Sequence, residues 1–146
     1  MAHATFGPEL EDPSPNGKVE PCKRSQGQVA ALDSSGICLF TAGAWGMSAL
    51  VDQINAACAG EWTKARLVEV GERVWNLERQ FNLSAGLTRA DDTLPPRMLR
   101  EPAPAGFAKG QVCGLESMLN EYYAVRGWDA NGAPTADTLE RLGLRS

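Results

Sequence analysis

The sequence predicts an all-α fold, a helical bundle-like domain whose helices are joined by proline-rich connectors. Apolar residues recur every three or four positions in several segments, which is the spacing of one face of an α-helix. Threonines precede and glycines follow these segments, as is typical of helix starts and ends. No segment alternates apolar and polar residues over the length of a strand. With 146 residues, the chain is long enough to bury one core.

The first part of the chain is expected to be an irregular lead-in. Residues 1–22 are rich in Pro, Gly, Asp and Glu and show no sustained period. Their abrupt start is typical of a segment that continues upstream. A C-terminal helical domain is expected over residues 23–146, beginning with a short helix from Lys23 to Leu32. The apolar side of this helix is formed by Val29, Ala30 and Leu32.

The strongest helical signals lie in the middle of the chain. Helical spacing predicts a helix that stops at Gly60 and carries Met47, Leu50, Val51 and Ile54. Thr63 is placed to cap the next helix, which is expected to reach Gly86 and to bury a continuous stripe of Leu67, Val70, Val74, Leu77 and Phe81. Gly71 lies within this helix, and glycine costs a helix about 1 kcal/mol relative to alanine. We therefore expect Gly71 to pack closely against a neighbouring element.

The last third of the chain begins with a connector. Residues 87–112 contain four prolines, which exclude a long regular element, and Thr88 is placed to cap a short turn there. An amphipathic helix ending at Gly127 is then predicted by Leu115, Met118, Leu119, Tyr122 and Val125. Thr135 is expected to cap a final short helix, which is held by Leu139, Leu142 and Leu144.

Composition excludes several classes of partner. The formal net charge is −4 and the pI is about 5.0, so neither nucleic acid nor anionic lipid is an expected partner. No apolar run approaches the roughly 20 residues of a membrane span. The first residues lack the basic and apolar regions of a signal peptide, and we expect a cytoplasmic protein.

The cysteine and histidine content limits the possible metal sites. Four cysteines occur without any CxxC pair, so the chain has no self-sufficient zinc or cluster motif. Free thiols in a reducing compartment are expected. Cys22, Cys58 and Cys113 are interpreted as small apolar residues. His3 is the single histidine, which excludes a site built on several histidines of this sequence.

Other candidate sites have simpler interpretations. Asp91 and Asp92 are adjacent at a predicted helix start, where they suit capping and dipole roles better than a catalytic pair. Asp129 and Asn131 precede a glycine as in a calcium loop, but the closing Glu is missing, so a plain turn is expected. Of the two adjacent tyrosines, the one on the apolar stripe, Tyr122, is expected in the core, and Tyr123 at its edge. None of these positions is taken as a site.

The stretch from Asp33 to Cys38, DSSGIC, is the main candidate site. It places a carboxylate and a thiol five residues apart, and Gly36 permits a tight path between them. A helical pattern follows, so the stretch is interpreted as a turn that presents both side chains to something outside the segment. On spacing alone, a buried cysteine beside a helix end is the more common arrangement.

Four blocks of sequence resemble the C-terminal domain of the aldehyde ferredoxin oxidoreductases, in the same order and at similar separations. GERVWNLERQFN is similar to a family stretch of the form Gly-Glu-Arg-Ile-x-Asn-Leu-Glu-Arg-x-Phe-Asn. The blocks span Gly17–Phe40, Gly71–Asn82, Asp91–Pro102 and Leu115–Thr135. The family contains tungsten-dependent, and in some members molybdenum-dependent, bis-pyranopterin enzymes. The resemblance covers nearly the whole chain from about Lys18 onward and implies an all-α domain.

The resemblance also implies roles for the residues of the turn, which matches the family motif Asp-x-x-Gly-Leu-Cys. Asp33 would accept hydrogen bonds from a pterin, and Cys38 would be the last of four thiolates on a [4Fe–4S] cluster. Ile37 stands where the family often has Leu, and backbone N–H groups around Gly36 could donate to cluster sulfurs. His3 is a candidate for the family's active-site histidine. The implied reaction oxidises an aldehyde to a carboxylic acid and passes electrons to ferredoxin.

The sequence also departs from the family. The other three cluster cysteines belong to an upstream CxxCxxxC motif that this chain lacks, and the N-terminal β domain that cradles the pterins is absent. We therefore expect a C-terminal domain that needs upstream pterin- and cluster-binding domains as partners and is inert alone. A gene fragment, a truncated reading frame and one part of a split enzyme stay open as its origin. Self-association through the apolar face that would meet those domains is also expected.

Two other functions stay open at this point. One is a stand-alone helical interaction module, or a non-catalytic remnant, that has kept the fold without the redox role. The other is part of a related tungsten enzyme with a different substrate, such as those that reduce aromatic thioesters. An upstream pocket outside this sequence would decide the substrate, as well as the choice between tungsten and molybdenum.

Overall fold

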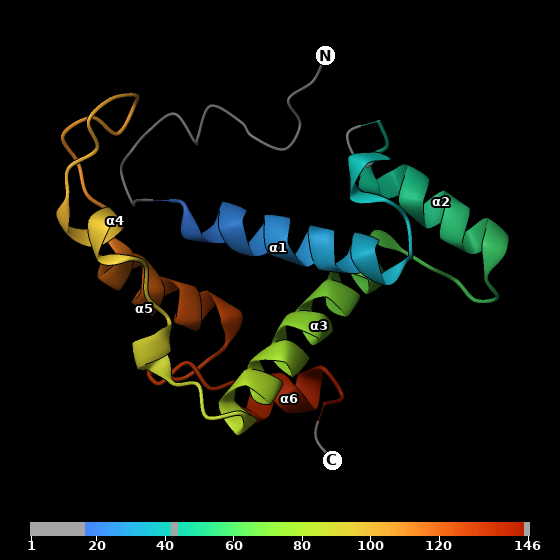
Figure 1. Ribbon diagram of the computed structural model, residues 1–146. Coiled ribbons are helices and arrows are strands. Elements are labelled where there is room, and N and C mark those ends of the chain that lie inside the picture. The colour runs from blue at the N-terminus through green and yellow to red at the C-terminus, as the bar shows by residue number, and fades with distance from the viewer. Residues whose placement is uncertain (1–16, 42–43, 145–146) are drawn as a thin grey trace.

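The chain consists of helices joined by irregular segments, as Figure 1 shows for the computed structural model, which describes residues 17–41 and 44–144. The helices are α1 (Val19–Ser34), α2 (Met47–Ala57), α3 (Lys64–Ser84), α4 (Pro96–Arg100), α5 (Leu115–Arg126) and α6 (Ala136–Arg141). Two single 3-10 turns are η2 (Leu39–Thr41) and η3 (Arg89–Asp91). The described residues contain isolated β-bridges but no strand. The predicted all-α fold is confirmed.

Helix α1 begins at Val19, four residues before the predicted start at Lys23. Pro21 lies in its first turn, where a missing N–H would have had no helical partner in any case. The N–H of Cys22 donates to the carbonyl of Lys18 at 3.0 Å, which closes the first turn. The last four residues of the expected irregular lead-in are therefore helical. The division into units at residues 22 and 23 stays a prediction, and His3 lies outside the described residues.

The predicted helix ends are confirmed at several positions. The hydroxyl oxygen of Thr63 accepts from the N–H of Arg66 at 3.2 Å at the start of α3. Thr135 does the same for Thr138 at 3.3 Å at the start of α6. Gly127 ends α5 with φ of +70°, a left-handed conformation that favours glycine. These ends could be predicted because each depends on a few neighbouring residues.

Helices α1 and α3 cross at a pair of glycines. Gly27 of α1 and Gly71 of α3 are both buried, and a Cβ on Gly71 would lie within 3.0 Å of the Cα, C and O atoms of Gly27. Near this point the indole N–H of Trp75 donates to the carbonyl of Gln26 at 3.0 Å. The close packing predicted for Gly71 is therefore confirmed. Figure 1 shows the two helices running obliquely to one another, with α2 at one end of the pair and α5 at the other.

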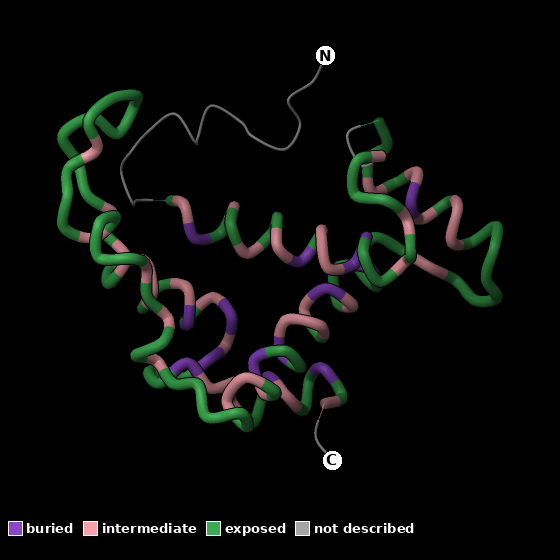
Figure 2. The backbone as a smooth tube through the Cα atoms, in the orientation of Figure 1, coloured by how far each residue is buried: buried purple, intermediate pink, exposed green. Residues whose placement is uncertain are grey.

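The apolar part of the interior joins α1, α2 and α3. Its buried residues are Ala31, Leu32, Leu50 and Leu67, against which Ile37, Met47, Val51, Ile54 and Trp62 pack. Helix α2 contributes the predicted face with Met47, Leu50, Val51 and Ile54, whereas α1 contributes Ala31 and Leu32 in place of the predicted Val29, Ala30 and Leu32. Figure 2 shows this buried region near the end of α1, whereas the outer side of α2 is exposed.

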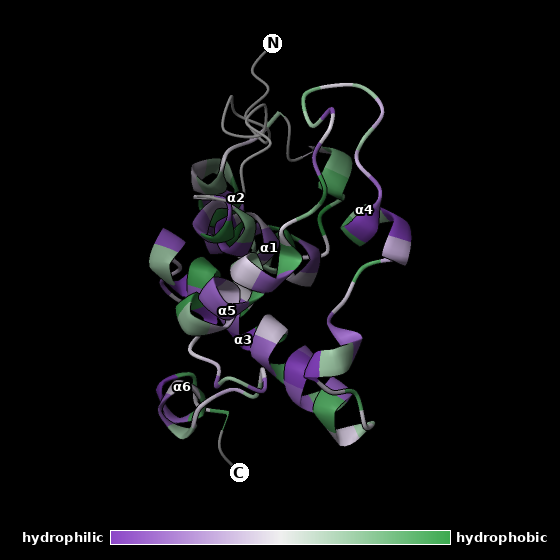
Figure 3. Cartoon of the chain, turned by 90° about the vertical axis from the view of Figure 1, so that its left-hand side faces the viewer, coloured by the Kyte–Doolittle hydropathy of each residue, from purple (hydrophilic) through white to green (hydrophobic). Residues whose placement is uncertain are grey.

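The second half of α3 differs from the predicted apolar stripe. Leu77 and Phe81 are 50% and 71% exposed, whereas Asn76 and Arg79 are buried. Asn76 Oδ1 accepts from the indole N–H of Trp128 at 2.9 Å. Because α5 and the turn after it cover the side of α3 that carries these polar groups, the apolar residues on the other side stay uncovered. Figure 3 shows both hydrophilic and hydrophobic residues on the helices in the region of α3 and α5.

Arg79 is the centre of the polar half of the interior. Its Nη1 and Nη2 donate to the two carboxylate oxygens of Asp92 at 2.8 and 2.6 Å, and its Nε donates to the carbonyl of Gly132 at 2.7 Å. The hydroxyl of Tyr123 donates to the same Asp92 carboxylate. A bidentate pair of this kind is geometrically specific. It ties α3 to η3, to α5 and to the turn before α6.

The burial of the two tyrosines of α5 is the reverse of the prediction. Tyr123 is 1% exposed and lies in the core, whereas Tyr122 is only half-buried. The Tyr122 hydroxyl donates to Gln26 Oε1 at 2.7 Å and accepts from Arg126 Nε at 2.8 Å. Both rings pack against Trp128, with ring centroids 5.8 Å apart in each pair.

We expect Gly71→Ala to lower the free energy of unfolding by about 1–3 kcal/mol, because the added methyl group would force α1 and α3 apart. Gly27→Ala is the matched control, since a Cβ at that position would meet nothing within 4 Å and alanine favours a helix. Urea unfolding followed by circular dichroism measures both. Equal stability of the two variants would contradict the crossing described above.

We expect the protein to lose stability between about pH 10 and pH 12 in a way that depends on Tyr123. Burial and the adjacent Asp92 carboxylate raise the pKa of Tyr123 to about 12. In that range the unfolded state releases the phenol proton while the folded state keeps it, so stability falls as pH rises. Tyr123→Phe should show a shallower alkaline loss in urea unfolding at a series of pH values. A slope unchanged from wild type would contradict this assignment.

Candidate functional site

The candidate turn lies where α1 ends. Asp33 belongs to the last turn of the helix, and the chain leaves it through Ser35 and Gly36. Gly36 has φ of +75°, and its N–H donates to the carbonyl of Asp33 at 3.1 Å. A side chain would be strained in this left-handed conformation, so glycine is needed between the carboxylate and the thiol.

Two contacts hold the backbone between Asp33 and Cys38. The Ser35 hydroxyl donates to the carbonyl of Leu32 at 2.5 Å and accepts from the N–H of Ile37 at 3.3 Å. The Ile37 side chain packs against the apolar cluster of α1, α2 and α3. Ile37 therefore anchors the turn, while the residues on either side of it face outward.

The two predicted ligand side chains are both exposed. Asp33 and Cys38 are at the surface, and Cys38 is a free cysteine. The carbonyl of Cys38 accepts from the N–H of Thr41 at 3.0 Å and from its hydroxyl at 2.6 Å, which closes η2. The turn is thus ordered on both sides of the thiol. A thiolate and a carboxylate in this setting can bind a group that lies outside the chain.

The donor set of this chain fits one corner of an iron–sulfur cluster. A [4Fe–4S] cluster takes four cysteine thiolates. In the described part of the chain, no group of three or more His, Cys, Asp or Glu gathers in a way that could hold a metal ion. Of the three cysteines interpreted as small apolar residues, Cys22 and Cys58 are exposed and Cys113 is half-buried. The exposed thiols were missed because burial depends on which elements cover a residue.

The remaining candidates have structural roles. Asp91 accepts from the backbone N–H and the hydroxyl of Thr88 in a capping box, and the first of these bonds lowers the pKa of Asp91. Asp92 is bound by Arg79 and Tyr123. Asp129 Oδ1 accepts from the N–H groups of Asn131 and Ala133 at 2.8 and 2.9 Å, which makes the predicted plain turn.

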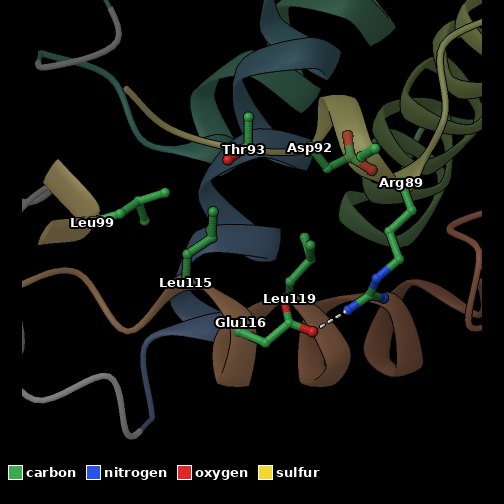
Figure 4. A pocket seen from close by; sticks show the side chains of 8 residues that line it. Arg89, Asp92, Thr93, Leu99, Leu115, Glu116 and Leu119 are labelled. Atoms are coloured by element: carbon green, nitrogen blue, oxygen red, sulfur yellow. Dashed lines mark hydrogen bonds and ion pairs between the residues drawn. The ribbon is translucent and has the colours of Figure 1, made fainter. Parts of the chain in front are cut away.

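A hollow of about 500 Å³ lies beside η3, α4 and α5, and the sequence contains no motif that predicts it (Figure 4). Its walls include Leu99, Leu115 and Leu119. Arg89 reaches across it, and its Nη2 donates to Glu116 Oε1 at 2.8 Å and to Asn120 Oδ1 at 2.8 Å. Among the charged residues that line the hollow, Arg89 is paired with Glu116 and Asp92 is paired with Arg79, so the hollow offers no free acid–base pair.

The sequence of this chain matches the model of a known protein family. The family model "Aldehyde ferredoxin oxidoreductase, domains 2 & 3" matches residues 2–144. The chain belongs to this family. This chain corresponds to the helical C-terminal part of the aldehyde ferredoxin oxidoreductases. The resemblance stated from the four sequence blocks is therefore confirmed.

Individual relatives agree with this family assignment. The tungsten-containing aldehyde ferredoxin oxidoreductase of Pyrococcus furiosus is 46% identical over 120 residues, covering 82% of this chain and 20% of the relative. That of Thermococcus kodakarensis is 44% identical over 116 residues, covering 79% and 19%. A P. furiosus protein described as "Aliphatic sulfonate oxidoreductase, WOR-like subunit" is 33% identical over 135 residues, covering 85% and 21%. The chain thus spans about a fifth of the length of these relatives.

A solved structure is similar in fold. It is the active site complex BamBC of benzoyl coenzyme A reductase in complex with 1,5-dienoyl-CoA, which matches with a TM-score of 0.71 and 26% identity. The match covers 90% of this chain and 20% of that one. Within the described part of the chain, none of the helices combines the length and the apolar character that crossing a membrane requires.

We expect Ser35→Ala to speed amide hydrogen exchange at Ile37 by about fivefold, because a hydrogen bond of this kind contributes about 1 kcal/mol. Ser34→Ala is the control, since the Ser34 hydroxyl donates back to the carbonyl of Ala30 within α1 and not to the backbone around Ile37. Exchange at Ile37 that is the same in wild type and both variants would show that Ser35 does not hold the backbone.

Proposed function

We propose that this chain supplies one thiolate of a [4Fe–4S] cluster, through Cys38, and one pterin contact, through Asp33, to a tungsten oxidoreductase. The proposed reaction is the oxidation of an aldehyde to a carboxylic acid, with ferredoxin as the electron acceptor. The observation that carries the proposal is the ordered turn that exposes both side chains in a chain of this family.

Each residue of the turn has a distinct task in this proposal. The Cys38 thiolate would bind one iron, and the Asp33 carboxylate would accept hydrogen bonds from the N–H groups of a pterin. Ile37 anchors the turn. The N–H groups of Gly36 and Ile37 already donate to Asp33 O and Ser35 Oγ, so bonds to cluster sulfurs have to come from the backbone after Ile37. When bound, the pterin metal supplies the two-electron chemistry and the cluster carries the electrons away.

The remaining ligands have to come from another polypeptide segment. Three further thiolates are needed, and the described residues contain no group of three or more His, Cys, Asp or Glu that could hold a metal ion. The curated relatives have about five times the length that this chain covers. Pterin- and cluster-binding domains, in the same protein or in a separate subunit, are therefore the proposed partners, and the chain alone is proposed to be inert. His3 as a catalytic residue stays a prediction.

We propose that this protein is located in the cytoplasm, because free cysteines are typical of a reducing compartment. Disulfides persist in oxidising environments, whereas this chain keeps all four of its thiols unpaired.

A second candidate is a tungsten enzyme of the same family with another substrate. It is supported by the sulfonate oxidoreductase relative and by the benzoyl coenzyme A reductase structure. The aldehyde enzymes are preferred because their identity to this chain is 42–46%, against 33% and 26%.

The test uses a chimera in which this chain replaces the matching fifth of the P. furiosus enzyme. Purified without oxygen, the chimera should contain about four iron atoms per chain and show a reduced-cluster signal in electron paramagnetic resonance. Cys38→Ala should remove most of the iron and the signal. Cys58→Ala is the matched control, because Cys58 is also exposed and lies at the end of α2.

Full iron content in the Cys38→Ala chimera would contradict the ligand role. A chimera that folds and binds neither iron nor pterin, with or without the substitution, would favour a helical interaction module or remnant. Asp33→Asn, compared with Asp52→Asn on the exposed side of α2, should lower pterin content while leaving the iron content unchanged.

A further inference from the structure

Two apolar side chains are exposed directly after Cys38. Phe40 is 95% exposed and Leu39 is 48% exposed, and both belong to the 3-10 turn η2. The turn is fixed by the two bonds from Thr41 to the carbonyl of Cys38, so an ordered backbone holds these side chains outward. Burying a phenylalanine side chain is strongly favourable, and an ordered, uncovered one next to a ligand residue points to a partner.

The position of the proposed cluster indicates which polypeptide segment lies next to these two side chains. If Cys38 holds one corner of the cluster, the segment with the other three thiolates has to approach the sulfur of Cys38. Phe40 follows Cys38 by two residues, which span at most about 7 Å of backbone. A segment that reaches the thiol therefore comes within reach of the phenyl ring as well.

We propose that Leu39 and Phe40 form a docking patch for the polypeptide that carries the remaining three cluster thiolates. This inference rests on the proposed function. The occupant belongs to the part of the family's proteins that this chain does not span, which is about four-fifths of the P. furiosus relative. Covering the patch buries apolar surface and keeps water away from the cluster side of the turn.

Other exposed aromatic side chains lack this link to a ligand. Phe107 is 75% exposed in the segment between α4 and α5, and Phe81 is 71% exposed near the end of α3. Neither follows a residue with a proposed ligand role. Phe107 is therefore a matched control for Phe40, because it is an exposed phenylalanine outside the turn.

The test measures docking without the cluster. In the chimera described above, with Cys38→Ala present throughout, hydrogen exchange is followed over residues 38–41. Phe40→Ser should speed exchange there by at least about tenfold, since the burial of the ring is lost. Phe107→Ser should leave exchange at these residues unchanged. In the isolated chain, where the patch has no occupant, both variants should match the parent.

The outcomes separate this proposal from the one on which it rests. Equal exchange in the Phe40→Ser and Phe107→Ser chimeras would overturn the docking patch, even if the iron data support Cys38 as a ligand. Loss of the ligand role would appear as retained iron in Cys38→Ala, whereas docking is judged by exchange alone. Protection of residues 38–41 in the isolated chain, together with a dimer in sedimentation, would identify a second copy as the occupant and also overturn the proposal.

Discussion

The contact between Gly27 and Gly71 is the constraint on which the rest of the structure depends. With no side chain on Gly71, the backbone of α3 comes close enough to that of α1 at Gly27 to fix the crossing of the two helices. The apolar cluster forms on one side of this point and the polar network of Arg79 on the other. Because α1 ends in the DSSGIC turn, the same crossing also sets the position of Asp33 and Cys38 relative to the core.

The two halves of the interior are held by different forces. Around Ile37 the helices associate through apolar burial, which is non-directional and tolerates small changes of shape. Around Arg79 they associate through a paired charge and several hydrogen bonds, which demand a fixed geometry. Removing one partner of a mostly buried pair is far more harmful than replacing the whole pair by apolar residues. The polar half therefore specifies the arrangement of α3, α5 and the turn before α6.

The features that sequence reasoning predicted correctly are mostly local. The caps at Thr63 and Thr135 and the stop at Gly127 depend on neighbouring residues, and a glycine within a long helix indicated close packing at Gly71. The errors concern burial. A periodic pattern shows that a helix has an apolar face, but the covering elements decide which face is used. Asn76 and Arg79 are therefore covered while Leu77 and Phe81 are not.

Some features of the candidate site could likewise be predicted from the sequence, whereas others could not. The turn, its glycine and its family could be inferred from a short motif and its surroundings, and the family is confirmed. The exposure of Cys22 and Cys58 could not be inferred from the sequence, because it depends on which other elements cover these residues. The ligand roles of Asp33 and Cys38 stay predictions, since the other ligands of the proposed cluster belong to a different segment.

Helix α1 also connects the contact with α5 to the candidate turn. Gln26 receives hydrogen bonds from Tyr122 and Arg126 of α5, and Asp33 follows it by seven residues, about 10 Å along a rigid helix. Because Gln26 is adjacent to Gly27, α5 and α3 hold α1 at the same place along its length, and Asp33 extends from that place along one continuous helix. Hydrogen bonds of Ser35 and Gly36 then connect the end of this helix to Cys38. The place where α1 is held and the place where the pair is exposed are thus different parts of one helix and the turn that follows it.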